Sequence, residues 1–494
     1  MKKLLYSILL ACSMSSCMNL ESEMYDVINP GIFPVNDVDA DALVTSAAYS
    51  PFRSNWYSGI FSTASGVQII GDMTTDLADC QWGGTVWEPL TDHAWTPDHS
   101  YVGRFYINHV RDISKMTLTM ERVSQIEMAE DKKNIFLAEL RCGRGWLAYL
   151  LYDCYGPIPV ATLDELKNPL EDKIIPRPTK EEMVKFIETE LLEAAKVLPA
   201  NYDRNSQNYG RFTKGLAYTV LMKLYMHEKQ WDKAEKIGRE LTKSEYGYDL
   251  VQSSYKDIFT LENEKNAEII WACQSDRSVN QQLWLAHALP SQYPTKNQSI
   301  QKWNGYRVPW EFYNTFEKED NRLDVLVGDF TGSDGIRYNQ ANKDKYNVLF
   351  LGAIPVKYGE DPIATGEESQ VDWVIYRYAD VITLLSEAIV RNGNAVTQEA
   401  VSLLNRVRIR AGLQAYSSSQ FVSVDDFLDK LLLERGHEFW FEGVRRSDLI
   451  RHGKYIQYAK DRGSLTTKPE YVLFPIPQSV INEGKGIIIQ NTGY

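Results

Sequence analysis

The sequence predicts a mainly α-helical protein, in which a scaffold of helical hairpins carries a loop-rich lobe. Apolar residues recur at helical spacing through most of 39–243 and again through 371–460. Between them, in 244–370, this periodicity is lost and Gly, Asn, Asp and aromatic residues become frequent. At 494 residues and 44% hydrophobic content the chain can bury a large core. One elaborated domain and two domains both fit this length, and we expect one, covering 18–494.

The N-terminus has the organisation of an export signal. Positively charged residues precede an apolar run at 4–11, which is too short to span a bilayer, and small residues then lead to Cys17. The residues before Cys17 resemble a degenerate bacterial lipobox, and those before Cys12 form a competing one. We favour Cys17 as the lipidated residue and exclude 1–17 from the fold. Several acyl chains on such a cysteine would anchor the protein firmly to a membrane.

The clearest helical hairpin covers residues 211–241. Leu221, Tyr225, Trp231 and Ala234 lie where a tetratricopeptide hairpin places its bulky first-helix residues, its aromatic residue near the turn and its small contact residue. We therefore expect Trp231 to fill the hairpin core. Such a hairpin exposes apolar surface on both sides, so further helix pairs must stack beside it.

Other segments supply those helices. Thr179 with Glu182 three residues later forms a capping-box pattern, which predicts a helix start. The Gly-Pro sequence at 156–157 predicts a helix end, because proline cannot continue the helix. The remaining predicted helices cover 39–57, 106–128, 134–155, 180–198, 374–391, 397–411 and 424–441. Strand-like fragments occur at 268–272 and 348–351, and a further helix is predicted to start at Pro309.

Composition excludes several classes of function. The 53 basic and 66 acidic residues give a net charge of −13, with no basic run in the mature part, which disfavours nucleic acid and anionic lipid as partners. Cys142 and Cys154 fall on one predicted helix about 18 Å apart, too far to form a disulfide. The sequence holds no CxxC pair, and its histidines lack the spacing of a zinc site. We expect neither a metal nor a cofactor.

Seven sequence blocks carry a family resemblance: AELRCGRGWLAYLLYDCYGPIPV, RFTKGLAYTVLMKLYMHEKQWDKAEKI, IYRYADVITLLSEAI, LLNRVRIRAGL, LLLERGHEFWFEGVRRSDLIRHGKY, VLFPIPQSVIN and QNTGY. Taken in their order, they are similar to the SusD/RagB family of outer-membrane nutrient-binding lipoproteins over nearly the whole mature chain. The resemblance implies a tetratricopeptide-like α-helical fold, attached by lipid to the surface of a Gram-negative outer membrane. It also implies a SusC-like TonB-dependent β-barrel transporter as partner, to which the protein delivers oligosaccharide.

Aromatic residues outside the helical periodicity are the candidate ligand contacts. A flat ring can cover the apolar face of a sugar while Asp or Asn satisfies its hydroxyl groups. A ring adds only about 0.5–1.5 kcal/mol beyond area burial, so micromolar binding needs several contacts. The sequence offers two clusters, the first in the Gly- and Thr-rich loop 71–100 and the second in the lobe. Their members are Trp82, Trp87, Trp95 and Asp72 in the first, and Tyr293, Trp303, Asn304 and Tyr306 in the second.

Two other interpretations of the charged residues and of the family resemblance stay open. Glycoside hydrolysis would need two carboxylates facing each other across a cleft, which Asp72, Asp76 and Asp79 could supply. We expect no enzymatic activity, because loop carboxylates more often bind solvent or sugar hydroxyls. The charged residues of 434–448 are spaced like ion pairs on a helix surface, which indicates a structural role. The alternative function is a transporter lid that binds peptide or has no direct ligand.

Overall fold

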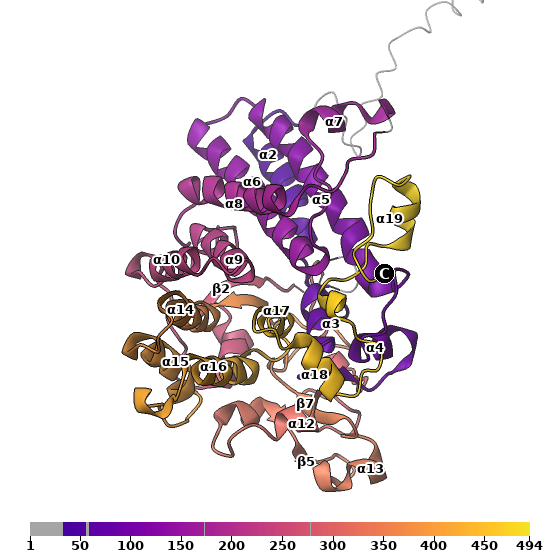
Figure 1. Ribbon diagram of the computed structural model, residues 1–494, viewed down its shortest axis with the longest axis vertical. Coiled ribbons are helices and arrows are strands. Elements are labelled where there is room, and N and C mark those ends of the chain that lie inside the picture. Colours follow the sequence, from indigo (N-terminus) through magenta and orange to yellow (C-terminus); the bar gives the residue numbers. More distant parts are fainter. Residues whose placement is uncertain (1–32, 56–58, 172, 277) are drawn as a thin grey trace, which may run out of the picture.

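The protein has a mainly α-helical fold with a lobe of short strands and loops on one side (Figure 1). The computed structural model describes residues 33–494, apart from 56–58, 172 and 277. Cys12, Cys17 and the export signal therefore lie outside the described residues.

Antiparallel helices stack from the N-terminal half into the predicted hairpin. Thr179 caps α8 as its sequence pattern predicts: its hydroxyl accepts from the backbone N–H of Glu182 at 3.2 Å, and the Glu182 carboxylate accepts from the backbone N–H of Thr179 at 2.8 Å. In the main stack α5, α6, α8, α9 and α10 each pack against the next, while α2 packs on α5 and α6, and α7 on α5. The helices are α2 (Asp37–Val44), α5 (Ser100–Ser124), α6 (Glu130–Tyr155), α7 (Leu163–Lys167), α8 (Lys180–Val197), α9 (Lys214–His227) and α10 (Trp231–Leu241).

The hairpin α9–α10 confirms the spacing that predicted it. Leu221 and Ala234 are fully buried and Tyr225 is nearly so. Trp231 differs from expectation, because its ring is only partly buried and lies under the guanidinium of Arg391, 4.9 Å from the ring centre. Arg391 belongs to a helix about 150 residues later in the chain, so the stack continues across the lobe sequence.

The C-terminal third completes the helical body. Helix α14 packs against α10, so this part of the chain adds directly to the first stack. The C-terminal tail then returns to the first half, where the tyrosine hydroxyl of Tyr494 accepts from the indole N–H of Trp95 at 2.7 Å. The helices are α14 (Tyr378–Gly393), α15 (Gln398–Arg410), α16 (Val424–Phe439), α17 (Arg445–Arg451), α18 (Tyr455–Asp461) and α19 (Gln478–Glu483).

Short strands organise the lobe, and one of them comes from the first loop. The largest sheet has the order β1-β3-β7-β4, β2 pairs with β8, and β5 pairs with β6. All pairs are antiparallel. The strands are β1 (Asp79–Cys80), β2 (Ile269–Cys273), β3 (Tyr306–Pro309), β4 (Leu326–Val327), β5 (Asp329–Thr331), β6 (Arg337–Asn339), β7 (Gly352–Pro355) and β8 (Trp373–Arg377).

Short helices also interrupt both loop regions; the sequence predicted one of them, at Pro309, and missed the others. They are α3 (Val67–Met73), α4 (Gly84–Thr91), α11 (Trp284–Ala288), α12 (Trp310–Tyr313) and α13 (Lys343–Tyr346). Each is only one or two turns long, so helical periodicity could not develop. The predicted strand at 268–272 is confirmed by β2, and the helix predicted at Pro309 starts one residue later as α12. The other strand lies at β7, just after the predicted 348–351.

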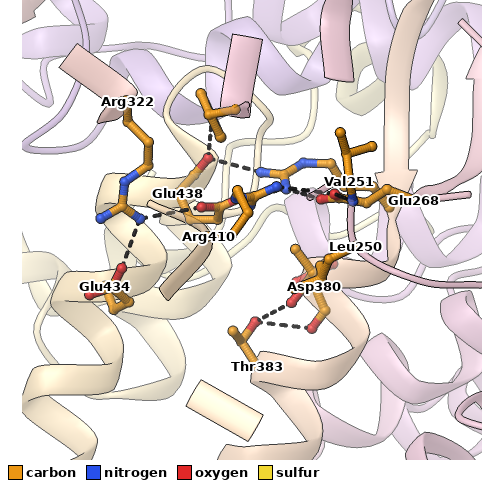
Figure 2. A network of polar contacts seen from close by, with 12 residues as sticks. Leu250, Val251, Glu268, Arg322, Asp380, Thr383, Arg410, Glu434 and Glu438 are labelled. Carbon is orange, nitrogen blue, oxygen red and sulfur yellow. Dashed lines mark hydrogen bonds and ion pairs between the residues drawn. The ribbon is translucent and has the colours of Figure 1, made fainter. Parts of the chain in front are cut away.

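A buried ionic network joins the lobe to the last helices (Figure 2). The Glu438 carboxylate accepts from Arg377 Nη1 at 2.5 Å, and Figure 2 shows its pair with Arg410. Arg377 further binds Glu268 at 2.7 Å. Arg322 from the lobe binds Glu434 at 2.8 Å, and both of these side chains are labelled in Figure 2.

These side chains are almost fully buried, so the expectation of ion pairs on a helix surface needs correction. Burial alone would raise the pKa of Glu438, but Arg410, Arg377 and Arg322 outweigh it and hold that pKa well below its usual value. The role of these charges is structural, as expected, but they act across elements and not along one helix.

Candidate functional site

The two aromatic clusters lie together because β1 pairs with β3. Asp79 is opposite Arg307 and Cys80 is opposite Tyr306. The ladder extends one step further, where the backbone N–H of Gln81 donates to the carbonyl of Gly305 at 2.9 Å. This pairing places the start of the first aromatic loop directly against the lobe. The separate clusters of the sequence are therefore one surface.

Trp82 forms a fixed, outward-facing ring on this surface. Its indole N–H donates to the carbonyl oxygen of Trp303 at 2.8 Å, which sets the orientation of the ring. The ring lies close against the backbone of Gly305: a Cβ added there would come within 2.4 Å of Trp82 Cζ2. Trp82 is nevertheless 38% exposed, and it is the only exposed tryptophan among the described residues.

Buried rings support Trp82 from below. The centres of Tyr306, His287 and Trp87 lie 5.5, 5.3 and 5.8 Å from that of Trp82. His287 stacks on Tyr306 with an angle of 12° between the rings, and it also contacts the edge of Trp303. Burial lowers the pKa of His287 to about 4, so the support is uncharged at neutral pH. This packing holds the ring of Trp82 in place before any ligand arrives.

Amide groups lie beside the ring. Asn304 is partly exposed and takes a left-handed backbone conformation, with φ of 58°. Its side-chain oxygen accepts from the buried guanidinium of Arg307, so the amide is fixed in place. The side-chain oxygen of Gln81 is buried without a hydrogen-bond partner among the described residues, and its NH₂ group donates to the carbonyl of Asn304 at 3.5 Å. We call Gln81, Trp82, Trp303 and Asn304 the Trp82 platform.

The remaining predicted contacts lie elsewhere or deeper. Trp87 and Tyr306 are buried beneath the platform, 7% and 0% exposed. Trp95 is also buried and contacts Tyr494 and Tyr471 of the C-terminal tail. Tyr293 is partly buried against Phe330, 5.2 Å between ring centres. These positions correct the sequence expectation: Trp87, Tyr306 and Trp95 fill the interior, and the platform keeps only Trp82, Trp303 and Asn304 from the predicted set.

Asp72 is likewise inside the protein. It is fully buried, and one carboxylate oxygen accepts from the backbone N–H of Gly443 at 2.9 Å. Burial raises its pKa to about 7. Asp72 therefore supports the junction with residue 443, and its carboxylate does not face a ligand as the sequence suggested.

The neighbouring carboxylates each have their own partner. Asp76 binds Arg445 through two contacts of 2.6 and 2.8 Å, and Asp79 lies 3.3 Å from Arg462. With Asp72 buried, these three residues do not form the open pair that hydrolysis needs. Within the described part of the chain, no group of three or more His, Cys, Asp or Glu residues is placed to hold a metal ion.

The sequence did not identify the residues that position the platform. Gln81, Gly305 and His287 act through a two-residue strand pair and through stacking across 200 residues of sequence. The glycine beside Asn304 was the only local signal.

Across the described residues, none of the helices is long and apolar enough to cross a membrane.

Comparison with protein families gives two matches along the chain. Residues 329–494 match the model described as SusD family, and residues 61–226 match the model described as starch-binding associating with outer membrane. The SusD-like protein P2 of Formosa agariphila is 21% identical over 99% of this chain and 98% of its own length. The starch-binding protein SusD of Bacteroides thetaiotaomicron is 23% identical over 86% and 84%.

Solved structures share the fold. A SusD homologue from Bacteroides thetaiotaomicron superimposes with a TM-score of 0.78 and 20% identity, covering 93% of this chain and 97% of the other. Surface glycan-binding protein A from the same organism, solved in complex with laminarihexaose, gives a TM-score of 0.72 and 20% identity, covering 92% and 100%. At these identities the similarity establishes the architecture alone.

Proposed function

We propose that this protein, a member of the SusD-like family, binds glycan at the cell surface and passes it to a transporter. One similar protein is named as starch-binding, and another, named as glycan-binding, was solved in complex with laminarihexaose. The protein itself performs no chemistry on the glycan. Its binding site is the Trp82 platform.

The observation that carries this proposal is the exposed and fixed ring of Trp82. Most large side chains that are exposed are free to rotate, whereas this indole is held by a hydrogen bond to Trp303 and by the packing beneath it. A fixed ring loses little conformational freedom on binding, which favours affinity. The apolar face of a pyranose can lie on the ring while its hydroxyl groups bond to the amide of Asn304 beside it.

The location and the partner extend this proposal. The family model that matches 61–226 is described as associating with the outer membrane. We infer that lipid on Cys17 attaches the protein to the outer face of that membrane, next to a SusC-like TonB-dependent β-barrel that imports the captured oligosaccharide. Co-purification of such a barrel with the tagged protein from native outer membranes tests the partnership, and recovery of the protein alone speaks against it.

The alternative of a transporter lid with no glycan ligand would be favoured by the burial of every candidate ring. Three of the predicted rings are buried, but the exposure of Trp82 and the partial exposure of Trp303 leave a surface that suits a sugar. We therefore place glycan binding first.

Affinity electrophoresis tests the proposal. The protein without residues 1–17 is run through gels that contain plant, host or microbial polysaccharides. We expect one class to retard it, and we expect Trp82→Ala to reduce the apparent affinity at least tenfold. Phe350→Ala is the matched control, since it removes another exposed ring, 46% exposed, from a different part of the lobe. Equal retardation of Trp82→Ala and wild type would reject the platform, and no retardation by any glycan would reject the function.

A further inference from the structure

A polar groove near the start of α5 lies beside the ring cluster of the Trp82 platform. We infer that this groove is a second contact region for the same glycan, so that the ligand is an uncharged oligosaccharide several units long. This inference rests on the proposed function and extends it to a part of the surface outside the platform.

Continuous side-chain contacts lead from the platform to the groove. Trp82 contacts Trp87, and Trp87 contacts Tyr101 at 5.6 Å between ring centres. The guanidinium carbon of Arg104 then lies 5.0 Å from the centre of the Tyr101 ring. In Figure 1, α4, which carries Trp87, lies between the lobe below it and α19 above it. The two regions are thus close enough for one chain of sugars to reach both.

The groove is a defined feature of the fold. It encloses about 300 Å³ between the first turns of α5 and the start of α19. His99 closes its base: the imidazole Nδ1 accepts from the backbone N–H of Val102, and Nε2–H donates to the carbonyl of Val86 at 2.9 Å. The backbone N–H of Gln478 donates to the carbonyl of Pro97 at 3.1 Å and holds the two walls together.

Its lining offers hydrogen-bonding groups that the protein does not use. The side chains of Asp98, Ser100, Asn108 and Ser479 make no hydrogen bond to another described residue. Gln478 uses only its NH₂ group, which donates to Asn482 at 2.9 Å, and keeps its oxygen available. Hydroxyl, amide and carboxylate groups in one groove match the donors and acceptors of sugar hydroxyls.

Two other grooves of similar size lack such a lining of unused polar groups. The groove of about 430 Å³ beside α8 is lined mostly by apolar side chains such as Val160, Met183 and Phe186. The groove of about 320 Å³ beside α9 contains charged groups that are already paired, including Lys180 with Glu228 at 2.8 Å. Of the three, the groove at α5 is the one suited to a sugar.

The charges of the groove select the class of sugar. Asp98 and Arg104 carry opposite charges, and burial lowers the pKa of His99, so the lining has no net charge at neutral pH. The whole chain carries a net charge of −13, which further disfavours acidic glycans. Neutral hexose units are therefore the expected occupants.

Fragments of increasing length test this inference. The polysaccharide that retards the protein most strongly is cut into fragments of two to eight units, and each is titrated into the purified protein by calorimetry. We expect affinity to rise with length beyond the unit bound at Trp82. Asn108→Ala should weaken the binding of the longest fragments three- to tenfold and leave the binding of the shortest fragments unchanged. Ser479→Trp, which fills the groove, should do the same.

The controls separate this inference from the function itself. Ser253→Trp adds the same ring at an exposed site elsewhere and should bind all fragments like wild type. Trp82→Ala should weaken the binding of fragments of every length. If Asn108→Ala and Ser479→Trp both bind the longest fragment within twofold of wild type, the second contact region is rejected while the platform stands. If wild type binds no polysaccharide at all, the proposed function is rejected, and this inference with it.

Discussion

At the scale of single residues, binding depends on how one indole is held. Trp82 is exposed, but its N–H bonds to the carbonyl of Trp303 and its ring lies on the backbone of Gly305. Only a residue without a side chain allows this close approach. Gly305 is therefore a positioning residue: it contacts the ring, and the ring contacts the ligand.

Gly305→Ala should displace the Trp82 ring and weaken glycan binding at least tenfold. The new Cβ would lie 2.4 Å from Cζ2 of the ring, well inside van der Waals contact, so the ring must move and lose its bond to Trp303. Affinity electrophoresis measures the loss of glycan binding, and thermal unfolding shows whether the variant is still folded. Gly393→Ala, where nothing lies within 4 Å of the added atom, is the control. Wild-type binding by Gly305→Ala would show that the position of the ring is unimportant.

Asp72→Asn should stabilise the protein increasingly as pH rises. Burial raises the pKa of Asp72 from 3.8 to about 7, so the folded protein holds this proton more tightly than the unfolded chain does. The stability of the wild type therefore falls as pH rises between these two values, and the neutral amide avoids that loss. Denaturant unfolding should show equal stability at pH 3.5 and an advantage for the variant on the order of 4 kcal/mol at pH 8. An advantage that is the same at both pH values would contradict this account.

At the scale of elements, the sequence predicted what is local. The hairpin α9–α10, the cap at Thr179 and the start of α12 follow from spacing or from one or two adjacent residues, and the structure confirms them. The short helices α3 and α4 were missed because they are too brief for periodicity to appear. The ionic network was placed on a surface because the partners of Glu438 come from β8 and α15, which no spacing within α16 can indicate.

Glu438→Ala should cost about 3–5 kcal/mol of unfolding free energy, because it leaves Arg377 and Arg410 buried with fewer partners. Glu399→Ala is the control: it breaks the exposed pair with Arg239, whose side chains are 46% and 51% exposed, and should cost under about 1 kcal/mol. Denaturant unfolding of both variants gives the comparison. Similar losses for the two would mean that the buried network contributes no more than a surface pair.

At the scale of the whole molecule, helical hairpins hold the lobe (Figure 1), and the main sheet of the lobe includes β1 from the first loop. The fold class was predictable, because stacked amphipathic helices leave a strong pattern and the family resemblance covers most of the chain. The site was predictable only in part. Trp82, Trp303 and Asn304 were proposed from their loop context, but burial separates them from Trp87, Trp95 and Tyr306, and burial depends on the complete fold.

A crystal structure of the protein with an oligosaccharide from the glycan that retards it tests the central claim most directly. The account predicts a sugar ring lying on the exposed face of Trp82, with hydroxyl groups bonded to the amide of Asn304. A glycan bound elsewhere, with the face of Trp82 left in solvent, would contradict it.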